Sequence, residues 1–178
     1  GPLDSDFYRY HSSEFVDINN DGYLDIVLGQ QKTASKFHVN QSSRIFINNG
    51  QGSFDKYIDL PQTKFYNGFT RVRGIEALDI NNDGRMDLVL AHNRQWGGGD
   101  NSAHYTGNYF QVLMQRIDGG FKDQTKRRIK GKQKWANGRK NNNVMSTELL
   151  VSDVNNDGYK DILINYNSTD IKYKAPTV

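Results

Sequence analysis

Cysteine is absent from the 178-residue chain, and proline occurs only three times. Without cysteine the protein has no disulfide bonds, and no thiolate is available to ligate a metal ion. No apolar run approaches the roughly 20 residues that a membrane-spanning helix needs. Glycine, by contrast, occurs 17 times, beside ten tyrosines and nine phenylalanines. This composition is typical of short strands and tight turns rather than of long helices.

The first residues carry no signal peptide, and residues 1–5 resemble the remnant of a cleaved expression tag. We therefore expect one domain over residues 6–178, and a native secretion signal can have preceded it. The formal net charge is +3, but basic residues gather between Lys122 and Lys140, where Asp123 is the only acidic residue.

An internal repeat organises the chain. Three segments share one pattern, EFVDINNDGYLDIVLG at 14–29, EALDINNDGRMDLVLA at 76–91 and LVSDVNNDGYKDILIN at 150–165. After the first two segments comes a strand pattern, a glycine-containing turn and a phenylalanine, at 45–54 and 112–121. The repeat units are thus about 13–73, 74–146 and 147–178.

Each complete unit predicts four short strands. The expected strands are about 13–18, 24–29, 43–48, 53–59, 74–80, 86–92, 108–116, 120–125, 147–154 and 160–166. Four strands in some 60 residues match one blade of a β-propeller. The apolar runs at 26–28, 88–90 and 162–164 would then be inner strands that are buried on both faces.

The number of units predicts an incomplete structure. About two and a half four-stranded blades do not close a propeller, which usually has about 4–8 blades. The chain is therefore expected to be part of a larger propeller or to be completed by self-association, and a solenoid-like stack is a third possibility.

The repeated loop Asp-x-Asn-Asn-Asp-Gly-x-x-Asp predicts calcium binding. Side-chain oxygens at positions 1, 3, 5 and 9 can converge with the backbone carbonyl at position 7, and water can complete the 6–8 oxygen ligands that calcium prefers. Hard oxygen ligands argue against zinc and copper, and magnesium demands a stricter geometry. The expected ligands of three calcium ions are Asp17, Asn19, Asp21, Tyr23 and Asp25; Asp79, Asn81, Asp83, Arg85 and Asp87; and Asp153, Asn155, Asp157, Tyr159 and Asp161.

An EF-hand begins with a similar loop but requires a bidentate glutamate at position 12 and flanking helices. Position 12 is Leu28, Leu90 or Ile164 here, and the flanks follow strand patterns, so an EF-hand is excluded.

These loops resemble the FG-GAP or VCBS type of repeat, which occurs in the β-propeller of integrin α subunits and in secreted bacterial proteins. DINNDGYLD, DINNDGRMD and DVNNDGYKD fit its calcium motif, and IFINNGQGSF fits the strands that follow. The resemblance covers residues 14–165. It implies a propeller, calcium at the loops, an extracellular, cell-surface or periplasmic location, and a role in adhesion or ligand recognition. The family often has Asp at position 3, where this chain has Asn, which lowers the charge of each site.

No catalytic constellation is visible, so we expect a protein that is not an enzyme. The sequence contains no HExxH and no G-x-S-x-G motif, and no carboxylate pair stands out outside the loops. The alternative is part of a propeller-type carbohydrate-active enzyme, such as a polysaccharide lyase, in which Lys, Arg, His or Tyr acts as the base.

Two segments are candidate ligand-binding surfaces. The loop 92–109 contains His92, Trp96 and His104, and the indole of Trp96 can face a sugar ring. The alternative is that the aromatic residues of this loop pack locally. The basic stretch is either a solvated loop or a patch for an anionic partner such as a glycan, and its candidate residues are Lys126, Arg127, Arg128 and Lys130. We expect a protein or glycan ligand and no specific nucleic-acid binding.

Overall fold

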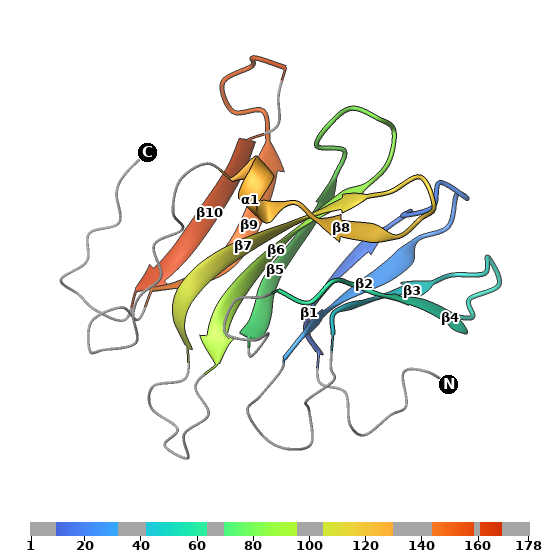
Figure 1. Ribbon diagram of the computed structural model, residues 1–178, viewed down its shortest axis with the longest axis horizontal. Coiled ribbons are helices and arrows are strands. Elements are labelled where there is room, and N and C mark those ends of the chain that lie inside the picture. The colour runs from blue at the N-terminus through green and yellow to red at the C-terminus, as the bar shows by residue number, and fades with distance from the viewer. Residues whose placement is uncertain are drawn as a thin grey trace.

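The computed structural model describes residues 10–31, 42–63, 70–95, 105–129, 144–158 and 161–168. Over these residues the chain is all-β, with ten strands in antiparallel sheets and one short helix (Figure 1). Each of the ten strands that the repeat predicts is present, with ends shifted by a few residues. Within the described part of the chain, no helix is long and apolar enough to cross a membrane.

The first sheet is formed by the first repeat unit. Its strands are β1 (Tyr10–Val16), β2 (Asp25–Gln30), β3 (Arg44–Ile47) and β4 (Lys56–Asp59), and each pairs with the next along the chain. The register places Phe15 opposite Ile26 and Val27 opposite Ile45. Simple antiparallel neighbours of this kind need only short connections between strands.

The second sheet repeats the same order. Its strands are β5 (Thr70–Leu78), β6 (Asp87–Gln95), β7 (Tyr105–Gln115) and β8 (Phe121–Asp123). The helical turn α1 (Thr125–Arg128) follows β8 directly. The basic stretch therefore begins with a strand and a helical turn rather than with a loop, and residues 130–143 lie outside the described residues.

The third repeat supplies two strands, β9 (Val144–Ser152) and β10 (Asp161–Ser168), which pair with each other. The three sheets stack in chain order, with the second sheet between the first and the third (Figure 1). A closed ring of sheets is not present among the described residues.

The hydrophobic core lies between the sheets. Val27 and Ile45 of the first sheet pack with Val72, Leu88 and Leu113 of the second. On the other face of the second sheet, Val89 and Ala91 pack against Leu149 of β9. The second sheet is thus buried on both faces, and this position explains the continuous apolar run in β6.

The prediction that all three apolar runs are buried on both faces is confirmed only for 88–90, where every residue is buried. In β2, Ile26 and Leu28 are half-buried, and in β10, Ile162 is 42% exposed. The reason for β2 is position in the stack, since Ile26 and Leu28 lie on the face that has no neighbouring sheet among the described residues. Ile162 lies on the same face as Leu149, but the second sheet packs mainly on β9 rather than on β10.

Two glycines allow the sheets to approach closely. A Cβ atom on Gly29 of β2 would lie 2.3 Å from Ser12 Oγ and 2.7 Å from Val72 Cβ of the next sheet. A Cβ atom on Gly74 of β5 would lie 3.3 Å from Leu149 Cγ of the third sheet. The absence of a side chain at these positions therefore sets how near successive sheets lie.

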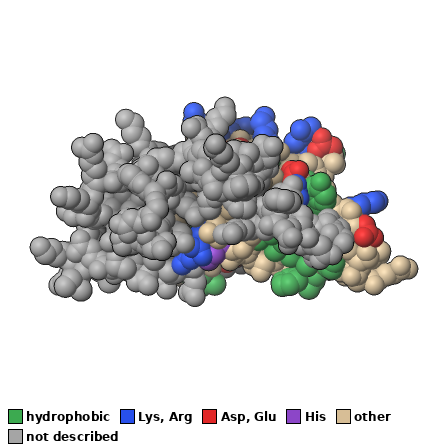
Figure 2. Space-filling view, turned by 90° about the horizontal axis from the view of Figure 1, so that it is seen from below, with side chains coloured by type: hydrophobic (Ala, Val, Ile, Leu, Met, Phe, Trp, Pro, Cys, Tyr) green, Lys and Arg blue, Asp and Glu red, His purple; other side chains and the backbone are tan. Residues whose placement is uncertain are grey.

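The three acidic loops join the first and second strands of each sheet, and their described residues are 17–24, 79–86 and 153–158. They project from the same edge of the stack, which is the upper edge in Figure 1. Figure 2 looks from below, toward the opposite edge, where hydrophobic side chains are visible among acidic and basic ones. The repeat thus places its three motifs along one edge of the molecule.

Candidate metal-binding loops

The backbone conformation of the loop requires particular residues at positions 4 and 6. Both positions have positive φ, where most side chains are strained but Asn and Gly are tolerated. The φ angles are 59° at Asn20, 57° at Asn82 and 58° at Asn156, and 89° at Gly22, 82° at Gly84 and 87° at Gly158. The three loops therefore have the same local fold.

The aspartate at position 1 accepts hydrogen bonds from the middle of its own loop. In the first loop, Asp17 Oδ1 accepts from the N–H of Asp21 at 3.0 Å, and Asp17 Oδ2 accepts from the N–H of Gly22 at 2.8 Å. Asp79 and Asp153 make the same pair of bonds in their loops. These bonds curl the chain around the carboxylate at position 1.

The pKa of Asp79 shows the effect of this arrangement. Burial alone would raise it, but hydrogen bonds from backbone N–H groups of the loop, those of Gly84 and Asp83 foremost, outweigh burial and lower the pKa. The loop backbone therefore presents a positive environment to a carboxylate that is ionised.

The residues at positions 3 and 5 are held together. Asn19 Nδ2 donates to Asp21 Oδ2 at 2.8 Å, and Asp21 Oδ1 accepts from the N–H of Tyr23 at 2.9 Å. The Asn–Asp pair recurs at Asn81 and Asn155. In the second loop alone, the Arg85 guanidinium at position 7 also forms an ion pair with the position-5 carboxylate.

The aspartate at position 9 is buried at the base of the loop. Asp25 is 0% exposed, with Oδ2 accepting from Ile18 N–H at 3.1 Å and Oδ1 from Asn48 N–H at 2.8 Å. Asp87 makes the equivalent bonds with Ile80 at 3.1 Å and Gln115 at 2.7 Å.

These buried carboxylates are electrostatically costly without a cation. Burial raises the pKa of Asp25, and the neighbouring carboxylates of Asp21 and Asp17 raise it further, although its two backbone hydrogen bonds oppose the change. Burial likewise raises the pKa of Asp87. A bound cation would relieve both the desolvation and the repulsion between carboxylates.

The donor set fits calcium. Four side chains in each loop offer oxygen atoms, and in the first loop each carboxylate oxygen accepts one hydrogen bond and has a further lone pair. In the second loop Asp83 Oδ2 has two partners, Asn81 and Arg85. In the described residues, no three acidic or histidine side chains surround a common point as metal ligands do, because the carboxylates turn toward the loop backbone. The position-7 carbonyls belong to Tyr23 and Arg85, while Tyr159 lies outside the described residues.

The first two loops touch across the sheets. Asn20 Nδ2 donates to the carbonyl oxygen of Gly84 at 3.1 Å. The turn between β3 and β4 also packs on the first loop, since Asn48 Nδ2 donates to the Leu24 carbonyl at 3.1 Å. A Cβ on Gly50 would lie 2.6 Å from the Tyr23 ring. The first loop is thus supported by the second loop and by the β3–β4 turn.

The candidate ligand-binding residues have different locations. His92 is 2% exposed, in the middle of β6, and both of its ring nitrogens lie within hydrogen-bonding distance of Thr70 and Gln111. It is an interior residue rather than a surface one. Lys126, Arg127 and Arg128 are exposed on α1. Trp96, His104 and Lys130 lie outside the described residues.

Two sets of residues were not found from the sequence. The sequence shows that Asn recurs at position 4 of all three loops. The reason for this recurrence is the positive φ at that position, which only the structure shows. No sequence pattern identifies Asn48 and Gln115, because they bond to the position-9 aspartates from distant segments and are different residue types.

Comparison with known families agrees with this geometry. Residues 17–90 match the family of FG-GAP-like repeats. The match begins at position 1 of the first loop and ends within β6, so it includes the first two loops. No match to the chain was found among the curated proteins.

Proposed function

We propose, from the premise that residues 17–90 are an FG-GAP-like repeat, that the chain is a calcium-stabilised recognition module of a secreted or cell-surface protein. The observation that carries the proposal is the identical conformation of three acidic loops, each with left-handed residues at positions 4 and 6 and the same hydrogen bonds to the first aspartate. Three copies of an unusual backbone are hard to explain as ordinary turns.

In this proposal each calcium ion is held by the side chains at positions 1, 3, 5 and 9 and by the carbonyl at position 7. The first site would use Asp17, Asn19, Asp21, Tyr23 and Asp25, and the others their equivalents. Calcium supplies positive charge that offsets the repulsion between three carboxylates. Extracellular modules bind calcium at about 10⁻⁴–10⁻³ M, which suits a location where calcium is abundant.

The stacked four-stranded sheets support a β-propeller as the architecture of the whole assembly. On the face of the third sheet that points away from Leu149 and the second sheet, Leu150 is 59% exposed and its cross-strand partner Leu163 is half-buried. Apolar side chains on such a face favour another sheet beside it, from further sequence or from a second copy. Sedimentation velocity over a range of concentrations would distinguish a second copy, which gives a concentration-dependent mass, from a monomer.

The rival function is part of a carbohydrate-active enzyme. A cavity between Pro61 and the segment 122–127 is lined by Tyr109, Lys122 and Lys126. Tyrosine and lysine are residue types that can act as general bases. Incubation with acidic polysaccharides, followed by absorbance of unsaturated uronate products, tests this function. Product formation that Tyr109→Phe abolishes would establish an enzyme.

Thermal unfolding tests calcium binding directly. At free calcium tenfold above Kd, each independent site is expected to stabilise the fold by about 1.4 kcal/mol. The melting temperature should therefore rise from excess chelator to millimolar calcium, and calorimetric titration should give three ions per chain. A melting temperature and a calorimetric signal that do not respond to calcium would refute the proposal.

A charge-only variant makes the test specific. Asp21→Asn retains an acceptor for the Tyr23 N–H but removes one carboxylate charge and the exposed hydrogen bond from Asn19, so it should weaken the first site while changing stability in chelator little. Asp55→Asn is the matched control, since Asp55 is an exposed carboxylate outside the loops. Equal calcium responses of the two variants would show that the loops are not the sites.

A further inference from the structure

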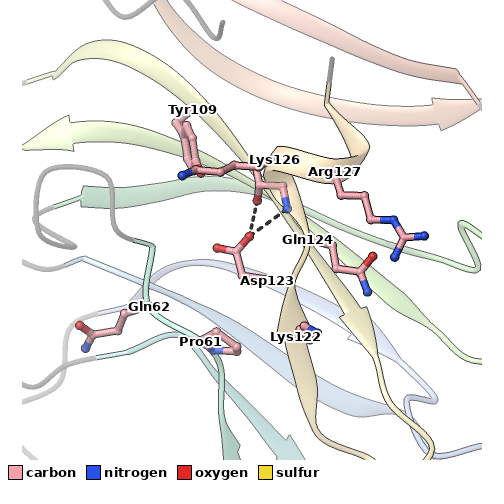
Figure 3. Close-up of a pocket in the computed structure, with 9 residues that line it drawn as sticks. Pro61, Gln62, Tyr109, Lys122, Asp123, Gln124, Lys126 and Arg127 are labelled. Atoms are coloured by element: carbon pink, nitrogen blue, oxygen red, sulfur yellow. Dashed lines mark hydrogen bonds between the residues drawn. The ribbon is translucent and has the colours of Figure 1, made fainter. Parts of the chain in front are cut away.

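A cavity of about 490 Å³ lies where the end of the first sheet meets α1. Figure 3 shows Pro61 and Gln62 on one side and the segment from Lys122 to Arg127 on the other. Tyr109 of β7 adds an aromatic ring to the lining. The volume lies within the range of small-molecule sites, about 300–1,000 Å³.

One buried side chain joins the two sides of this cavity. Gln111 is 1% exposed, and its Nε2 donates to the Pro61 carbonyl at 3.0 Å and to Asp123 Oδ2 at 3.0 Å. Its Oε1 lies 3.0 Å from Nε2 of His92, whose Nδ1 lies 2.9 Å from Thr70 Oγ1. The walls are therefore fixed from inside the core, so the site is built before any ligand arrives.

The wall formed by α1 is fixed in the same way. Asp123 Oδ1 accepts from the N–H and the hydroxyl of Thr125, at 2.9 and 2.6 Å, as the dashed lines in Figure 3 show. Thr125 Oγ1 in turn accepts from the N–H of Val112 at 2.9 Å. The helical turn is thereby attached to β7, and the residues that follow Thr125 have a defined place.

The lining is basic. Lys122, Lys126 and Arg127 are exposed, and Asp123 is the only acidic residue beside them. Within the described residues, none of the three cations forms an ion pair, whereas Arg44, Arg85 and Arg116 elsewhere do. The Asp123 oxygens are engaged by Thr125 and Gln111, so the cavity has cations available for an external anion.

The lining also offers an acceptor. Asp123 Oδ2 accepts one hydrogen bond, from Gln111, whereas Oδ1 accepts two from Thr125. A carboxylate oxygen has two lone pairs, so Oδ2 can accept one further donor. A ligand that satisfies both kinds of group carries an anionic group and hydroxyl donors together.

We propose that this cavity binds a sugar residue bearing a carboxylate or sulfate group, with Lys122 and Lys126 on the anion and Asp123 Oδ2 accepting from a hydroxyl. Pro61 and the Tyr109 ring supply the apolar surface for the C–H face of the sugar. This inference rests on the proposed recognition role but not on calcium. Nucleic acids instead track along extended basic grooves with successive stacking rings, whereas these groups surround one cavity.

Calorimetric titration of the full chain tests the proposal. The probes are a uronic-acid disaccharide, a sulfated disaccharide, a neutral disaccharide of the same size and inorganic sulfate. We expect one or both acidic disaccharides to bind more tightly than the neutral sugar and than sulfate, and the two acidic probes distinguish a carboxylate from a sulfate ligand.

Charge-matched variants locate the binding. The double variant Lys126→Gln/Arg127→Gln should weaken binding of the acidic disaccharide by about tenfold to a hundredfold, because the charged hydrogen bond from Lys126 and the neighbouring positive charge of Arg127 are lost. The double variant Lys56→Gln/Arg116→Gln removes the same charge from β4 and the β7–β8 turn, and should bind as the parent does. Melting temperatures establish that both variants fold. If Lys126→Gln/Arg127→Gln does not fold, the single variant Lys122→Gln gives the same readout.

Three results would overturn the proposal. These are no binding of either acidic disaccharide, equal weakening by the two double variants, and inorganic sulfate or a single-stranded oligonucleotide binding as tightly as the acidic sugar. Repeating the titration in chelator separates this site from the loops. Saccharide binding that persists in chelator keeps the cavity site even if calcium fails to stabilise the fold.

Discussion

The side-chain amide of Gln115 donates a 2.9 Å hydrogen bond to the carbonyl oxygen of Ile18, which lies 97 residues earlier in the chain. The backbone N–H of Gln115 also donates to Oδ1 of Asp87 at 2.7 Å. One residue at the end of β7 therefore closes the loop of its own sheet and supports the loop of the preceding sheet. The acidic loops are thus parts of the packing between sheets.

Replacing Gln115 should affect a loop to which it does not belong. Gln115→Ala leaves the Ile18 carbonyl without its donor in a buried environment, at an expected cost of about 1–3 kcal/mol in the free energy of unfolding. It should also weaken calcium binding at the first loop. Chemical denaturation and calcium titration measure both effects. Gln51→Ala, in the exposed β3–β4 turn, is the control, and a similar loss there would rule out the specific role.

The left-handed conformation at position 4 predicts a difference between two small substitutions. Asn82→Ala should destabilise the protein by about 1–2 kcal/mol, because alanine is strained at φ 57°. Asn82→Gly should restore most of that stability, since glycine has no Cβ atom. Thermal unfolding of the two variants compares them. Alanine as stable as glycine would mean that the loop has another conformation in solution.

Close approach of the sheets predicts a ranking of two glycine substitutions. Gly29→Ala should cost about 1–3 kcal/mol or more, because its Cβ would meet Ser12 Oγ at 2.3 Å. Gly74→Ala should cost less, since its nearest contact would be the Leu149 side chain at 3.3 Å, which can shift. Denaturant midpoints give the order, and the reverse order would contradict the packing between the first two sheets.

His92 predicts a loss of stability in mild acid. Burial lowers its pKa from 6.5 to about 4, while the bond to Gln111 and the charge of Asp123 act in the opposite direction. The unfolded chain therefore takes up a proton at higher pH than the folded one. The contribution of neutral His92 to the free energy of unfolding is present above pH 6.5 and is lost as the pH falls toward 4. Its full size is about 3 kcal/mol.

Other groups titrate in the same range, so the effect is measured as a difference. Burial raises the pKa of Glu14 and Glu76, and such groups favour the folded state as the pH falls. His11, whose pKa is also lowered to about 4, acts in the same direction as His92 but is exposed. The gap in unfolding free energy between the parent protein and His92→Gln should narrow in acid. A difference in unfolding free energy that does not depend on pH would show that His92 is already charged at neutral pH, or that solvent reaches it in the folded protein.

The repeated elements could be predicted from the sequence because local patterns determine them. The alternation and apolar runs gave ten strands, and the glycine at position 6 gave the turn of each loop. The family match over residues 17–90 confirms the resemblance of the first two loops. Calcium at the loops stays a prediction.

What could not be predicted depends on contacts between distant residues. His92 begins the segment 92–109 that the sequence predicts as a candidate ligand-binding loop, but the stacking of the sheets buries it beside Gln111. The turn α1 lies within the basic stretch, where three consecutive basic residues give no apolar periodicity that predicts a helix. It is attached to Val112 of β7 by the Thr125 hydroxyl and by the N–H of Gln124.

The buried floor of the cavity, formed by Gln111 and its partners, and the exposed rim of the cavity differ in how freely their residues can change during evolution. The Gln111 amide joins the Pro61 carbonyl to Asp123 and also ends the polar chain through His92, so substitutions there would disturb packing and binding at once. Lys122, Lys126 and Gln62 lie at the rim, where exchange costs little stability. Related proteins are therefore expected to vary in which ligand they choose while retaining the floor of the cavity.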